Sequence, residues 1–138
     1  MTKKILLLLF TVFILSIIFI SCKKFDTTAT TIQGTSTTPY TSIDPILGQE
    51  YKLQVQATGN TITIAIVSDV NGQITPVGEA ETIDKLYQET GSSNYSFQTG
   101  VMSGNFSILS TDQIKISFVR NTPPYLSVRD VICTANNP

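Results

Sequence analysis

The stretch "YKLQVQATGNTITIAIVSDV", residues 51–70, decides the fold class of this 138-residue chain. Apolar and polar residues alternate in two runs, and the dipeptide Gly59-Asn60 separates the runs. The apolar positions are Tyr51, Leu53, Val55, Ala57, Ile62, Ile64 and Ile66. A period of two on both sides of a Gly/Asn turn is typical of a β-hairpin with one buried face.

The same alternation continues beyond this hairpin. Asn71-Gly72 predicts a second tight turn, because Asn-Gly favours positive φ at both central positions. A short strand over residues 73–77 should follow, and Pro76 places it at a sheet edge. Pro123-Pro124 breaks the chain before the last run. The other predicted strands cover residues 95–98, 106–108, 114–118 and 125–135. The last run has two possible inward-facing sets: Leu126, Val128 and Ile132, or Tyr125, Val131 and Cys133.

Residues 79–90, "EAETIDKLYQET", have a different pattern. Ala80, Ile83 and Tyr87 (or Leu86) recur at helical spacing, and Gly91 can cap the end, so one short helix is predicted. About seven short strands at near-regular spacing predict an all-β fold. We expect a small antiparallel β-sandwich of immunoglobulin-like outline, with a small β-barrel as the alternative.

The amino-terminal segment is a long apolar run that ends at a cysteine. Lys3 and Lys4 precede residues 5–20, which only Thr11 and Ser16 interrupt, and Ser21-Cys22 follows. The run is slightly long for the apolar part of a signal peptide and short for a spanning helix. An uncleaved membrane anchor and a secretory peptide cut elsewhere are therefore alternatives.

The segment resembles the signal peptide of bacterial lipoproteins, and "SCKK" after an Ile/Phe-rich core is similar to that of Bacteroidetes-type bacteria. The resemblance implies cleavage before Cys22 and attachment of acyl chains such as palmitate to its thiol. Residues 1–21 are then the signal peptide, and the remaining chain carries a net charge of −3, from seven basic and ten acidic residues. Several acyl chains anchor stably where one does not. We expect an outer-membrane lipoprotein on the periplasmic face.

Residues 22–45 are rich in Thr and Ser and show no apolar period. We expect the lipidated cysteine and a flexible linker here, followed by the β-sandwich domain over residues 46–138.

Candidate chemistry is sparse. Histidine is absent, which excludes Ser-His-Asp catalysis and histidine-based zinc sites. The sequence has no stripe of basic residues, which is the pattern that would predict nucleic-acid binding. Cys133 lies in an apolar run and is expected to be a buried structural cysteine. Asp69 and Asn71 are weak metal-ligand candidates, with a hairpin turn as the alternative.

Two further groups of residues are candidate sites. Glu79, Glu81, Asp84 and Glu89 form an acidic group that suits either paired-carboxylate hydrolysis or a solvated face. The tyrosines suit either sugar stacking or core packing, and they are Tyr40, Tyr51, Tyr87, Tyr95 and Tyr125.

These features predict a lipid-anchored envelope lipoprotein with a non-catalytic binding or structural module. No cofactor is expected, and the partner is membrane lipid through Cys22, together with an envelope protein or a glycan. A small-ligand carrier with a barrel cavity and a small carboxylate-dependent envelope hydrolase are the alternatives.

Overall fold

The computed structural model describes residues 25–26 and 31–135, and in this part the chain is all-β with eleven strands and no helix. No described helix is therefore long and apolar enough to cross a membrane. The predicted signal peptide (1–21) and lipid site (Cys22) lie outside the described residues. The strands are Phe25–Asp26 (β1), Tyr40–Ser42 (β2), Tyr51–Thr58 (β3), Thr61–Val70 (β4), Gln73–Pro76 (β5), Glu81–Ile83 (β6), Leu86–Glu89 (β7), Asn94–Gln98 (β8), Met102–Ser110 (β9), Gln113–Arg120 (β10) and Leu126–Ala135 (β11).

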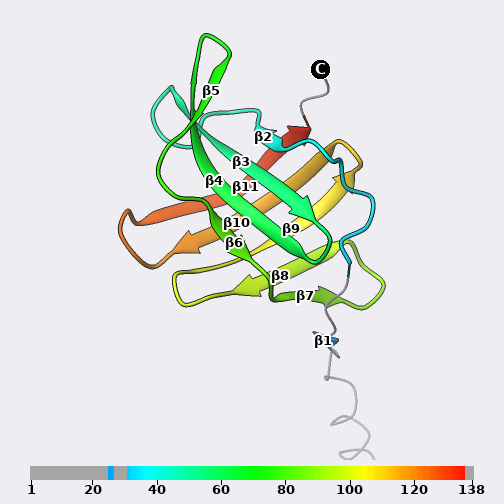
Figure 1. The fold of residues 1–138 in the computed structure, drawn as a ribbon. Helices are drawn as coiled ribbons and strands as arrows, with labels where there is room; N and C mark the ends of the chain where they lie inside the picture. Colours follow the sequence, from blue (N-terminus) through cyan, green and yellow to red (C-terminus); the bar gives the residue numbers. More distant parts are fainter. Residues whose placement is uncertain (1–24, 27–30, 136–138) are drawn as a thin grey trace, which may run out of the picture.

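All eleven strands belong to one antiparallel sheet. Its order is β1-β7-β8-β9-β10-β11-β2-β3-β4-β5, and β6 also pairs with β4. The short β2 joins the two halves, because it pairs with β11 on one side and β3 on the other. In Figure 1, β3, β4 and β6 cross in front of β8–β11, so the sheet curls over itself.

One hydrophobic core fills the space inside this curl. Nineteen buried residues contributed by both halves of the sheet form a single cluster. Its largest fully buried side chains include Tyr40, Phe106 and Leu53, and the rings of Tyr95 and Phe106 stack with centroids 4.8 Å apart. Fully burying a large apolar side chain contributes about 1.5–3 kcal/mol, so this cluster is the main source of stability.

The predicted hairpin is confirmed. Thr58 pairs with Thr61 around Gly59-Asn60, and the inward positions Leu53, Val55, Ala57, Ile62 and Ile64 are buried. Tyr51 is an exception, because it lies at the start of β3 with 39% of its surface exposed. The second turn is also confirmed, since Val70 pairs with Gln73 around Asn71-Gly72, and both turn residues have positive φ.

The predicted helix over residues 79–90 is wrong. β6 and β7 occupy this segment, with Ile83 paired to Ile62 and Leu86 paired to Phe97. Only Asp84 and Lys85 separate β6, next to β4, from β7, next to β8. Three apolar residues at helical spacing make a weak signal, and burial of Ile83 and Leu86 against two different strands overrides it.

We expected a flexible linker up to residue 45 and a domain from residue 46. The structure shows that part of the linker segment already belongs to the folded domain. Tyr40, Thr41 and Ser42 form β2 and are buried, and Ile32 is buried in the same core. The backbone N–H of Ile32 donates to the carbonyl oxygen of Gly59. A three-residue strand is too short to show a period of two, which is why the Thr/Ser-rich composition conceals it.

A β-bulge resolves the two phases of the last strand. Leu126 and Val128 face inward before the bulge, and Cys133 faces inward after it. Arg129 and Asp130 together lie opposite Ser117 at this bulge, Asp130 has a φ of 50°, and its N–H donates to Ser117 Oγ at 2.8 Å. One inserted residue shifts the alternation, so two of the three residues in each predicted set face inward, and the exceptions are Ile132 and Tyr125.

Candidate functional site

A cleft of about 140 Å³ opens where β4 changes its pairing partner. β4 pairs with β6 at Ile64 and with β5 at Val67, and the chain leaves the sheet over residues 77–80. The Val77 N–H donates to the Ile66 carbonyl, which fixes where that departure begins. This segment forms one wall of the cleft, and β9, β10 and the start of β11 form the other.

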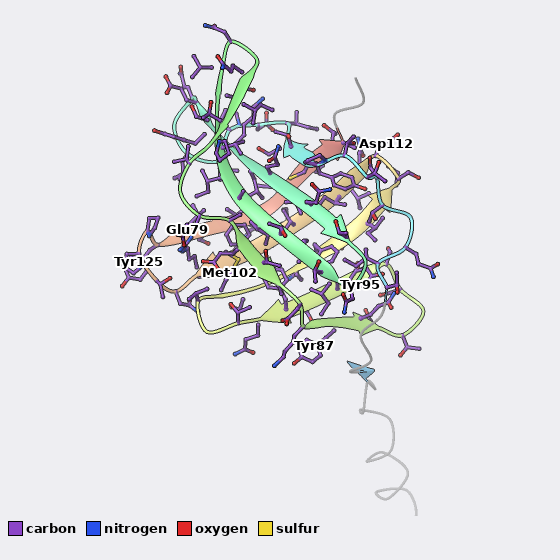
Figure 2. The ribbon with its side chains drawn as sticks, viewed as in Figure 1. Glu79, Tyr87, Tyr95, Met102, Asp112 and Tyr125 are labelled. Carbon is purple, nitrogen blue, oxygen red and sulfur yellow. The ribbon has the colours of Figure 1, made fainter. Side chains whose placement is uncertain are left out.

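The floor of the cleft is apolar. Met102, Phe118 and Leu126 come from three neighbouring strands of one half of the sheet, and Ile64 comes from the other half. All four side chains are buried members of the core. In Figure 2, Glu79 and Met102 lie toward the same side of the molecule, which is also the side of Tyr125. The cleft therefore reaches from a charged rim down to core side chains.

Three charged residues line the cleft, and two of them form an ion pair. Arg120 Nη2 lies 3.3 Å from Glu81 Oε1, and both side chains are partly buried. Arg120 Nε is buried and has no hydrogen-bond partner among the described residues. Glu79 is exposed on the loop, and in the described part of the chain its carboxylate has no ion-pair or hydrogen-bond partner. The lining therefore carries one positive and two negative groups.

The two weak metal candidates belong to the β4–β5 hairpin. Asp69 pairs with Lys52 at 2.8 Å and accepts a hydrogen bond from the Gly72 N–H at 3.1 Å. These bonds, chiefly the one from Lys52, hold the pKa of Asp69 below its usual value. Within residues 25–26 and 31–135, no group of three or more His, Cys, Asp or Glu residues could hold a metal ion. Asn71 occupies the turn itself.

The four acidic residues of the group predicted over residues 79–90 lie on two strands and the segments beside them, because this part of the chain forms no helix. Glu79 and Glu81 line the cleft from the same wall, since only one residue separates them along the chain. Asp84 lies in the link after β6, and Glu89 ends β7. Two carboxylates on one wall do not face each other across a substrate, as glycoside hydrolysis requires.

Cys133 is buried and unpaired with another cysteine in the described residues, as predicted for a structural cysteine. Burial raises the pKa of its thiol to about 12. Among the tyrosines, Tyr40 and Tyr95 belong to the core. Tyr125 is 75% exposed, and it lies on the same side of the molecule as the cleft residues Glu79 and Met102 (Figure 2).

Arg120 and Met102 are cleft residues that the sequence analysis missed. A signal for Arg120 exists, because it continues the inward-facing series Ile114, Ile116 and Phe118 at a spacing of two. A charged residue in an inward phase is unusual and marks either a partner or a ligand. Met102 has no such signal, since one methionine before Ser103-Gly104 shows no period.

The described chain is an all-β protein with a small cleft that combines an apolar floor and charged walls. Comparison of the chain with protein-family models, curated proteins and solved structures gave no match. Its function therefore has to follow from the cleft and from the amino-terminal sequence.

Proposed function

We propose that this protein is a lipid-anchored lipoprotein of the bacterial envelope, on the periplasmic face of the outer membrane, whose sheet domain is a non-catalytic binding module. The cleft at the partner change of β4 is the observation that carries the binding role. A pocket with an apolar floor and a few convergent polar groups is the usual form of a ligand site. The resemblance of the segment ending at Ser21-Cys22 to a lipoprotein signal peptide supports the anchor.

The domain is proposed to sit close to the membrane. β1 begins at Phe25 and pairs with β7, so only Lys23 and Lys24 separate the acylated cysteine from the sheet. At about 3.3–3.6 Å per residue, a link of this length reaches at most on the order of 10 Å. Both lysines are then near the headgroups, where each contributes about 1 kcal/mol on an anionic surface.

A small-ligand carrier is the second candidate, and the same cleft favours it because its floor lies between the two halves of the sheet. The single hydrogen-bonded sheet and the two-residue link between β6 and β7 support the barrel description over the immunoglobulin-like sandwich. A partner protein or glycan remains part of the proposal for the binding module.

Membrane fractionation with two cysteine variants tests the anchor. Cys22→Ser removes the acylation site, and the matched control Cys133→Ala removes the buried thiol. We expect Cys22→Ser to lack acyl mass and to leave the membrane fraction, while Cys133→Ala stays acylated and bound. Tight membrane association of unacylated Cys22→Ser would mean that an uncut helix holds the protein.

Native mass spectrometry of the acylated protein, purified from envelopes in mild detergent, tests the binding role. We expect a non-covalent small-molecule adduct of any chemical class. A spectrum of bare protein from freshly prepared envelopes would count against both the binding module and the carrier.

A further inference from the structure

We propose that the cleft binds a small zwitterion with an apolar body, such as an α-amino acid with an aliphatic side chain. This inference rests on the proposed binding role and names its ligand class. The cleft brings together an arginine with unused donors, a carboxylate without a partner and an apolar floor. Each of these matches one part of such a ligand.

The arginine matches the carboxylate of the ligand. A guanidinium has five N–H donors, and the described structure gives Arg120 one contact, from Nη2 to Glu81. Its Nε is buried without an acceptor, so a ligand in the cleft would meet the terminal nitrogens of the guanidinium instead. Arginine binds carboxylates through two parallel hydrogen bonds, so a ligand carboxylate beside Glu81 would use the remaining terminal N–H groups.

The glutamates match the ammonium group of the ligand. Glu79 and Glu81 give the lining a net charge of −1 after Arg120 is counted. A ligand with only a negative charge would meet this excess and be repelled. A ligand with only a positive charge would leave the donors of Arg120 unused. A zwitterion satisfies both, and Glu79 is available because it has no partner in the described chain.

The apolar floor and the volume of the cleft limit the size of the ligand's apolar side chain. Met102, Phe118 and Leu126 offer a buried apolar surface to a side chain of the ligand. The volume of about 140 Å³ is close to that of a cavity of roughly 150 Å³ that holds a benzene molecule. The side chain of leucine or valine is smaller than benzene and fits this space, whereas that of tryptophan is too large and glycine lacks the apolar contacts.

Isothermal titration calorimetry of the acylated protein in detergent tests the ligand class with three matched probes. Leucine carries both charges, isoamylamine lacks the carboxylate and isocaproate lacks the ammonium group. We expect leucine to bind about tenfold more tightly than either single-charge probe. If isoamylamine or isocaproate binds as tightly as leucine, the proposal of a zwitterionic ligand is overturned. The absence of any heat from leucine at millimolar concentrations would also overturn it. If a native adduct is present in either case, the binding module stands and only the ligand class falls.

Variants at the cleft separate the two charged contacts. Arg120→Gln should weaken leucine about tenfold, but it should not weaken isoamylamine, because losing this positive charge leaves the lining more negative. Glu79→Gln, on an exposed loop residue that cannot disturb the core, should weaken leucine and isoamylamine alike by about threefold. The matched controls Arg129→Gln and Glu50→Gln change the same charges at exposed positions away from the cleft and should change neither affinity. Unchanged leucine affinity in Glu79→Gln would overturn the proposed ammonium contact.

Discussion

The hydroxyl of Tyr40 donates a 2.8 Å hydrogen bond to the carbonyl oxygen of Thr111, although 71 residues separate them in the chain. The same hydroxyl accepts from the Ser36 N–H at 2.6 Å. Tyr40 lies in β2, between β11 and β3, and its side chain is fully buried. The Thr/Ser-rich segment therefore ties the β9–β10 turn to the centre of the sheet.

Removing this hydroxyl should measurably weaken the fold. Tyr40→Phe leaves the Thr111 carbonyl without this donor and the Ser36 N–H without its acceptor, so we expect a loss of about 1–2 kcal/mol in unfolding free energy. Urea denaturation measures the loss. The control Tyr51→Phe changes a tyrosine on the surface of the sheet and should stay within about 0.5 kcal/mol of the parent. Equal stability of Tyr40→Phe would mean that the bonds of this hydroxyl to Thr111 and Ser36 do not stabilise the fold.

Gly104 is expected to tolerate no side chain. A Cβ there would clash with the Ser117 carbonyl oxygen and lie 2.6 Å from Phe118 Cβ. Because the backbone of β10 has to move, Gly104→Ala should cost about 2–3 kcal/mol of unfolding free energy. Thermal and urea unfolding measure the cost. Gly100→Ala is the matched control, since no atom lies within 4 Å of a Cβ at that position; a neutral Gly104→Ala would refute the close approach of β9 and β10.

The Cys133 thiol should be protected in the folded protein. Its pKa is about 12 because burial disfavours the thiolate, against an ordinary value of 9.0. In a Cys22→Ser background, a thiol reagent at pH 8 should react only after denaturant is added. Rapid labelling under native conditions would show that β11 opens readily.

Because burial raises the pKa of the Cys133 thiol, we expect the protein to lose stability at alkaline pH. The unfolded thiol deprotonates near pH 9 while the folded thiol keeps its proton, so its stabilising contribution is full below pH 9 and falls from pH 9 to about 12. This group alone contributes a slope of about 1.4 kcal/mol per pH unit. Cys133→Ala should show a shallower decline over that range when unfolding is measured under reducing conditions. Identical slopes would contradict the raised pKa.

The ion pair of Lys52 and Asp69 should control how Asp69 titrates. Its pKa lies below the usual value of 3.8, so its contribution to stability is present above that pH and is lost as the pH falls through the lowered pKa. Lys52→Gln should raise the pKa of Asp69, which carbon-detected NMR of the carboxylate measures. Lys115→Gln, which removes a more exposed contact 3.9 Å from Asp130, should leave Asp69 unchanged. The idea fails if Asp69 titrates identically in Lys52→Gln.

The local sequence pattern was enough to predict the structure wherever two strands that follow each other in the chain also pair in the sheet. The alternation around Gly59-Asn60 and Asn71-Gly72 sets the β3–β4 and β4–β5 hairpins, because a tight turn fixes the register of the strands it joins. The burial of Cys133 also followed from its apolar surroundings. These features depend on side chains that are close in sequence, and the class of fold follows from them.

Long-range pairing decided the rest. β6 and β7 are strands because β4 and β8 bury Ile83 and Leu86, and residues 79–90 alone carry a weak helical spacing instead. β2 exists because β11 and β3 offer free edges on both sides of it. The cleft likewise forms from segments more than 20 residues apart, which bring Glu81 to Arg120 and Glu79 to Met102. A sequence determines which residues prefer burial, but only the way the whole sheet curls over itself determines which of them meet.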